Sequence, residues 1–225
     1  MEFIDFILHF DDYLVRAISE IGAGTYVLLF LIVFAETGLV ITPFLPGDSL
    51  LFAAGTLASR GLLDVWVVMA SLVAAAILGD TVNYWAGSKI GAKVFTRENP
   101  RFLKASHLQK TQAFYAKHGA KTIVIARFVP IVRTFAPFVA GVGKMPYARF
   151  FVYNVFGALV WVMGLTLGGF FLGSLPMVKK NFELAILAII ALSVLPGVVA
   201  FIRHRKSSPD AIDVSYEKVQ EIFHE

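Results

Sequence analysis

Five long apolar runs dominate this chain of 225 residues and restrict what it can fold into. The runs cover roughly residues 26–47, 62–86, 122–143, 150–176 and 182–202. Each is close to the ~20 residues that a helix needs to cross the hydrocarbon core of a membrane. Charged residues make up 16% of the chain, whereas a soluble domain has about a quarter. The sequence therefore predicts an all-α, polytopic membrane protein with one membrane domain, residues 1–206.

The first run contains residues that interrupt a membrane helix. These are two acidic residues with three helix breakers between them: Glu36 and Asp48, with Pro43, Pro46 and Gly47. Proline removes a backbone donor and breaks a helix, and glycine adopts turn conformations that other residues avoid. We expect residues 26–58 to form a re-entrant hairpin, in which two helices enter the membrane and leave on the same side.

The third run has the same character, with basic residues in place of acidic ones. It contains two arginines and two prolines: Arg127 and Arg133, with Pro130 and Pro137. We expect residues 122–143 to form a second re-entrant hairpin, broken at both prolines, with Gly141 and Gly143 in a turn. Irregular backbone inside a membrane is stable only where protein or a water-filled cavity surrounds it.

Basic residues indicate which elements face the cytoplasm. The sequence RHRK, residues 203–206, follows the last run and places the C-terminus in the cytoplasm. Eight of the 20 basic residues lie between Lys89 and Lys121, beside a single acid. We expect residues 89–118 to be a cytoplasmic amphipathic segment that contacts anionic lipid headgroups, and not nucleic acid.

The remaining ranges complete the predicted topology. Residues 62–86, 150–175 and 182–202 are expected to be full transmembrane helices, so the two hairpins enter from opposite faces. Each hairpin is then followed by a full span, which is the pattern of an inverted repeat. An amphipathic helix is predicted for residues 1–21 and a polar cytoplasmic tail for residues 207–225.

Four charged side chains, two from each hairpin, are expected to meet inside the membrane: Glu36 and Asp48 with Arg127 and Arg133. An ionised group that faces lipid is costly, so such groups pair or line an interior. Arginine offers phosphate a planar fork of donors and stays charged, so the arginines are the candidate phosphate ligands. The carboxylates are candidate proton carriers or charge-balancing groups, although a purely structural lock between the hairpins is also open. Asp80 either completes this site or hydrogen-bonds to nearby backbone.

Other motifs indicate no enzyme, cofactor or metal site. The chain has no cysteine, and no group of His, Asp and Glu has the spacing of metal ligands. The string GDSLL, residues 47–51, matches a serine esterase motif, but the Asp-x-x-His sequence that accompanies it there is absent. No GxxxxGK[ST] loop is present, so ATP-driven transport is not indicated. Asn154 and Trp161 are interpreted as packing groups, and His107 and His118 as solvated.

Four stretches follow a recognisable pattern: FAETGLVITPFLPGDSLLFAAG from residue 34, GDTVNYWAG from 79, FYAKHGAKTIVIARFVPIVRTFAPFVAGVGKM from 114 and YNVFGALVW from 153. They closely resemble the bacterial DedA family, part of the wider SNARE-associated Golgi, or VTT-domain, superfamily. The resemblance implies a bacterial inner-membrane protein with two facing re-entrant hairpins. It also implies movement of lipids such as undecaprenyl phosphate or phospholipid between leaflets, with a link to the proton-motive force. The essential charged positions of the family match Glu36, Asp48, Arg127 and Arg133.

The residues and the resemblance together predict a flippase or scramblase for a phosphate-bearing lipid. The alternative is a proton-coupled exporter of a small cation or drug that uses the same carboxylates. A membrane scaffold without transport activity is a third interpretation. The expected partners are membrane lipids and protons, and a homo-oligomer is left open.

Overall fold

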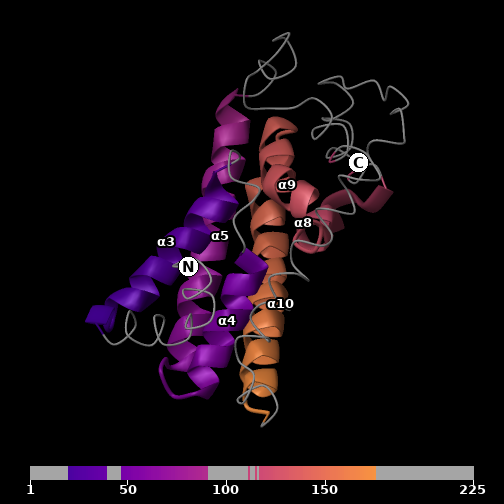
Figure 1. Cartoon of the computed structure of the whole chain (residues 1–225). Helices are drawn as coiled ribbons and strands as arrows, with labels where there is room; N and C mark the ends of the chain where they lie inside the picture. Colours follow the sequence, from indigo (N-terminus) through magenta and orange to yellow (C-terminus); the bar gives the residue numbers. More distant parts are fainter. Residues whose placement is uncertain (1–19, 40–46, 91–110, 112–114, 116, 176–225) are drawn as a thin grey trace, which may run out of the picture. The chain divides into compact units, whose positions relative to one another are not determined.

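The computed structural model describes residues 20–39, 47–90, 111, 115 and 117–175. This part of the chain contains helices and no strand, which confirms the all-α prediction (Figure 1). The helices are α3 (Gly24–Gly38), α4 (Gly47–Ser59), α5 (Val65–Ile90), the 3₁₀ helix η1 (Gly119–Lys121), α8 (Thr122–Ala126), α9 (Pro130–Val142) and α10 (Tyr147–Gly173). The predictions for residues 1–21, 182–202 and 207–225, and most of 89–118, lie outside the described residues.

Two of the described helices are long and apolar enough to cross a membrane, by length and composition. They cover Val65–Lys89 and Tyr147–Gly173, overlapping the predicted spans 62–86 and 150–175. At 1.5 Å per residue, α5 and α10 are each about 40 Å long, which exceeds the ~30 Å hydrocarbon thickness. Both helices therefore have the length to cross with some tilt or with their ends in the headgroup region.

The connection between α4 and α5 follows from local sequence signals. Gly61 has a φ of 77°, a left-handed conformation that favours glycine. The amide of Gly61 donates to the Ala58 carbonyl, and the amide of Leu62 donates to the Leu57 carbonyl. This pair of bonds is the Schellman motif that ends a helix. The Asp64 carboxylate then accepts the amides of Trp66 and Val67, at 2.8 and 3.0 Å, and caps the start of α5.

The break between α8 and α9 has a clear cause in Pro130. Residue Val129 before it is extended, with φ −121° and ψ 102°, and Pro130 is the first residue of α9. A proline disfavours helical backbone in the residue before it and fits the first position of a new helix. The predicted break at Pro130 is therefore present. The break predicted for the first run involves Pro43 and Pro46, which lie outside the described residues, and Gly47, which begins α4.

The prediction that Pro137 also breaks the helix is wrong, because Pro137 lies inside α9. An internal proline removes the amide that would donate to the carbonyl four residues earlier, and its ring crowds that carbonyl. Here the neighbouring carbonyls of Thr134 and Ala136 accept side-chain donors, Asn83 Nδ2 at 2.9 Å and the Tyr115 hydroxyl at 2.9 Å. These tertiary bonds hold the turn of α9 that precedes the proline, and the helix continues through it to Val142.

The described residues divide into two compact units. The first unit contains residues 20–32, 47–74 and 162–175, and the second contains 33–39, 75–90 and the described part of 111–161. The helices α3, α5 and α10 each contribute one segment to both units. Each unit is therefore built from segments far apart in the sequence.

Glycine contacts join α4 to α10 in the first unit. A Cβ on Gly55 would overlap the backbone of Thr166, and a Cβ on Gly169 would overlap the backbone of Phe52. The Thr56 hydroxyl donates to the Gly169 carbonyl at 3.1 Å across the same crossing. Small residues let membrane helices approach this closely, so their backbones pack directly against each other.

The second unit contains a crossing of the same pattern, between α9 and α5. A Cβ on Gly141 would overlap the backbone of Tyr84, and a Cβ on Gly87 would overlap the backbone of Phe138. In both units each glycine meets the residue three positions before the partner glycine. Gly141, which the sequence assigned to a turn, is therefore a helix-contact residue. Gly143, the other glycine assigned to a turn, does lie in the turn after α9, together with Lys144, whose φ is 54°.

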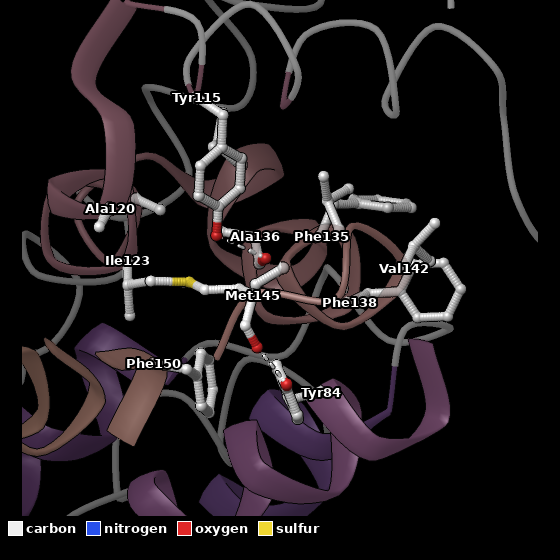
Figure 2. Close-up of a cluster of buried hydrophobic side chains, with 14 residues drawn as sticks. Tyr84, Tyr115, Ala120, Ile123, Phe135, Ala136, Phe138, Val142, Met145 and Phe150 are labelled. Carbon is white, nitrogen blue, oxygen red and sulfur yellow. Dashed lines mark hydrogen bonds between the residues drawn. The ribbon is translucent and has the colours of Figure 1, made fainter. Parts of the chain in front are cut away.

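An apolar cluster around α9 forms the core of the second unit (Figure 2). Its largest side chains include Tyr115, Phe135, Phe138 and Phe150, all almost fully buried. The Tyr115 hydroxyl donates to the Ala136 carbonyl (Figure 2). Burial raises the pKa of the Tyr115 phenol well above its usual value, so this hydroxyl keeps its proton and remains a donor.

Candidate functional site: a cluster of buried ion pairs

The first ion pair of the second unit joins α3 to α9. Arg133 Nη2 lies 2.7 Å from Glu36 Oε1, and both side chains are more than nine-tenths buried. Glu36 lies in the last turn of α3 and Arg133 in the first turn of α9, so each side chain lies near the end of a helix. A buried charge is stable only with a partner of opposite sign, and this pair meets that condition for both residues.

The second ion pair joins the break between α8 and α9 to α5. Arg127 caps the C-terminal end of α8, and its Nη2 lies 2.5 Å from Asp80 Oδ2. The same nitrogen donates to Asn154 Oδ1 on α10 at 2.6 Å, and the Asn154 amide in turn donates to the Ile77 carbonyl at 3.1 Å. Arg127 is therefore held by one group from each of two long helices, the charged carboxylate of Asp80 on α5 and the neutral amide of Asn154 on α10.

Asn83 connects the two sides of the first ion pair. Its Nδ2 donates to the Thr37 carbonyl at 3.1 Å and to the Thr134 carbonyl at 2.9 Å. Thr37 follows Glu36 in the sequence, and Thr134 follows Arg133. One fully buried amide on α5 thus bridges the two helices whose charges pair.

Trp161 on α10 lies against both arginines. Its ring centroid is 5.7 Å from the Cζ atom of Arg127 and 5.1 Å from the Cζ atom of Arg133. Both distances are within the ~6 Å range of a cation–π interaction. We refer to the four charged residues with their three neutral neighbours as the ion-pair cluster: Glu36, Asp80, Arg127 and Arg133, with Asn83, Asn154 and Trp161.

The four charged side chains of the cluster balance, with two carboxylates and two guanidinium groups. Two nitrogens of Arg127, Nε and Nη1, are nevertheless buried without a hydrogen-bond partner among the described residues. Guanidinium N–H groups are strong donors, and leaving them unbonded in a buried place costs free energy. Arg127 therefore has donor capacity left over that an anionic oxygen atom would satisfy.

The structure brings some of the predicted site residues together. Glu36 meets Arg133, as expected, and the question about Asp80 is answered because Asp80 is the partner of Arg127. Asp48 lies half-buried in the first turn of α4, in the first unit, and the other four lie in the second unit. The described residues contain no group of three His, Asp or Glu side chains that could hold a metal ion.

Three members of the cluster were not predicted as members from the sequence. Asn83 was not singled out, and Asn154 and Trp161 were interpreted as packing groups. The available signal was spacing, because Asp80 and Asn83 are three residues apart and Asn154 and Trp161 are seven apart. Both spacings place a polar or amphipathic pair on one face of a helix.

We expect Asn83→Ala to lower the free energy of unfolding by about 1–3 kcal/mol, since it removes two buried bonds between helices that contribute roughly 0.6–1.7 kcal/mol each. Thr81→Ala is the matched control on the same helix, because the bond that the Thr81 hydroxyl makes among the described residues lies within α5, to the Ile77 carbonyl. Unfolding of the purified protein in detergent measures both. Equal losses in the two variants would contradict the bridging role of Asn83.

Comparisons with known proteins identify the class that this fold and cluster define. A family model described as the VTT domain matches residues 45–171. Protein DedA of Escherichia coli (strain K12) is 54% identical over 210 residues, which are 92% of this chain and 96% of that protein. An uncharacterized membrane protein of Mycobacterium tuberculosis is 42% identical over 204 residues, 88% and 89% of the two chains. Inner membrane protein YghB of E. coli is 34% identical over 170 residues, 76% and 78% of the two chains.

The long apolar helices and the buried charges are those of a helical membrane protein, and the relatives are named as membrane or inner membrane proteins. This chain belongs to the VTT-domain, or DedA, family. The resemblance found in its motifs is thereby confirmed. No solved structure matches the chain.

Proposed function

We propose that this protein is a flippase or scramblase that moves a phosphate-bearing lipid, such as undecaprenyl phosphate or a phospholipid, between the leaflets of the bacterial inner membrane. The observation that carries the proposal is the buried Arg127, which keeps two donor nitrogens without a partner among the described residues. Arg127 and Arg133 both lie against the indole ring of Trp161. Two adjacent guanidinium groups suit a phosphate, which accepts several charge-assisted hydrogen bonds. The proposed activity is transport and not catalysis.

In this proposal the headgroup binds without dismantling the ion pairs. Phosphate oxygens accept hydrogen bonds from Nε and Nη1 of Arg127, while Nη2 stays with Asp80. The empty cluster is electrically balanced, so a bound anion adds a negative charge that is costly in a buried place. Uptake of a proton by Glu36 or Asp80 restores the balance, and this is the proposed link to the proton-motive force. Asp48 is proposed as a further proton-carrying or charge-balancing group.

The proposed architecture is a pair of re-entrant hairpins in an inverted repeat, with the C-terminus in the cytoplasm. The break at Val129 and Pro130 supports the second hairpin. The matching glycine crossings of the two units support the repeat, since α4 packs on α10 with the same spacing as α9 packs on α5. In each crossing a helix that follows one break packs on the long helix that follows the other.

The position of the cluster along the helices suggests the side from which a headgroup enters. Trp85 on α5 and Tyr147 on α10 contact each other, with ring centroids 5.5 Å apart, and both are exposed. Exposed Trp and Tyr gather at membrane interfaces. Asp80 is five residues from Trp85 and Asn154 is seven from Tyr147, which correspond to about 8 and 10 Å along the helices. The headgroup would thus travel a short way inward from this aromatic border.

The alternative function is a proton-coupled exporter of a small cation or drug. The observation in its favour is that Glu36 and Asp80 are buried carboxylates in one cluster, 3% and 4% exposed. Each of these carboxylates already pairs with an arginine, whereas Arg127 has two donor nitrogens without a partner among the described residues. This difference makes the lipid the preferred substrate.

The test is lipid movement in liposomes that contain the purified protein and a fluorescent phospholipid or short-chain polyprenyl phosphate. We expect Arg127→Lys to lower the initial rate roughly 10- to 100-fold, because a hydrogen bond to a charged group is worth about 1.5–3 kcal/mol and lysine lacks the planar fork. Arg149→Lys is the matched control, since Arg149 is exposed on α10. If the wild type moves neither lipid while a pH-sensitive dye reports cation-driven proton flux, the exporter is the better account.

A further inference from the structure

Trp161 is the one neutral side chain of the cluster that contacts both arginines through an aromatic face. The two Cζ atoms lie 5.7 and 5.1 Å from its ring centroid, and the side chain is 1% exposed. The carboxylates differ in this respect, because Asp80 on α5 pairs with Arg127 and Glu36 on α3 pairs with Arg133. Trp161 on α10 is thus the shared element.

An indole face and a carboxylate hold a guanidinium group in different ways. A carboxylate occupies N–H groups and cancels the charge, whereas the electron-rich face of an indole attracts the cation and leaves its N–H edge available. Two arginines that contact one ring also repel each other, and a ring that attracts both offsets part of that repulsion. Contact with Trp161 therefore keeps two like charges together without occupying their N–H groups.

We propose that Trp161 is a positioning residue that holds the guanidinium groups of Arg127 and Arg133 against one indole ring, so that both bind the phosphate of a single lipid headgroup. This inference rests on the proposed function. In it, Trp161 sets the spacing between the two arginines that bind the phosphate. It differs from a packing role in what it requires of the ring. Packing depends on the volume of the side chain, whereas positioning depends on the electron density of its face.

Fluorinated tryptophans separate these two roles, because each added fluorine withdraws electron density from the ring with little change in size. The experiment places tryptophan and its mono-, di- and trifluoro derivatives at position 161 of the full chain by nonsense suppression. Binding of a short-chain polyprenyl phosphate to the protein in nanodiscs is then measured, with the uncharged polyprenyl alcohol in parallel. We expect the affinity for the phosphate to fall with each fluorine, by about 2- to 30-fold over the series. The affinity for the alcohol should not follow this trend.

The same series at Trp66 is the matched control, because Trp66 is an exposed tryptophan of α5 that lies in the first unit and is not part of the ion-pair cluster. It should give no trend. Trp161→Phe should bind phosphate better than Trp161→Leu, since phenylalanine keeps a weaker aromatic face. A flat response to fluorine in a protein that binds the phosphate would overturn the role of Trp161 and leave the proposed function intact. Absence of phosphate binding by the unmodified protein would overturn both.

Discussion

Replacing Arg127 with glutamine will destabilise this protein more than replacing Arg127 and Asp80 together. The single variant leaves the Asp80 carboxylate, which is 4% exposed, without the cation beside it. Removing one partner of a buried ion pair costs about 3–5 kcal/mol, because the remaining charge stays buried and uncompensated. The double variant Arg127→Gln/Asp80→Asn removes both charges and keeps amide groups of similar size. We expect it to recover most of the lost stability.

Unfolding in detergent measures the stability of the three proteins, and the liposome assay then separates folding from function. The recovered double variant should be folded and yet fail to move lipid, because the guanidinium donors are gone. Arg149→Gln provides the control for loss of an exposed positive charge from α10. Lipid movement at the wild-type rate by the double variant would show that this ion pair only locks the helices together. A double variant as unstable as the single one would show that the pair is not the reason for the loss.

Much of the cluster follows from the sequence because charge and proline in an apolar run have few explanations. Arg127 and Arg133 lie on either side of Pro130, so they require a break in the helix and buried acidic partners. Glu36 is one of these partners. The choice between Asp48 and Asp80 as the partner of Arg127 could not be predicted. It depends on how α5 crosses the break between α8 and α9, and hydrophobic periodicity within one helix does not specify a crossing between two.

The same limit explains why Pro137 and Gly141 were misread. A proline in an apolar segment breaks the helix unless neighbouring side chains support it, and the supporting donors, Asn83 and Tyr115, are distant in the sequence. A glycine near the end of an apolar segment suits a turn or a close helix contact equally well. Only the partner backbone, here that of Tyr84, decides between them.

Two glycines of α10 provide the second prediction with a large effect on stability. Both lie in the same apolar helix, but Gly169 packs against the backbone of another helix and Gly164 does not. We expect Gly169→Ala to lower the free energy of unfolding by about 3 kcal/mol or more, at the upper end of overpacking losses, since the new Cβ would overlap backbone atoms of Phe52 that cannot rotate away. Gly164→Ala lies five residues earlier on α10 and meets nothing within 4 Å. It should be neutral or stabilise the protein by up to about 1 kcal/mol through helix propensity.

Thermal and denaturant unfolding of the two variants in detergent measures this difference, and Gly141→Ala extends it to the second unit. A Cβ at Gly141 would overlap the Tyr84 backbone in the same manner, so the loss should resemble that of Gly169→Ala. Similar losses at Gly169 and Gly141 would mean that both crossings depend on direct backbone contact, as two copies of one structural repeat require. Equal behaviour of Gly169→Ala and Gly164→Ala would instead place α4 further from α10 than these contacts indicate. In that case the proposed repeat would lose its strongest support, while the ion pairs of the second unit would be unaffected.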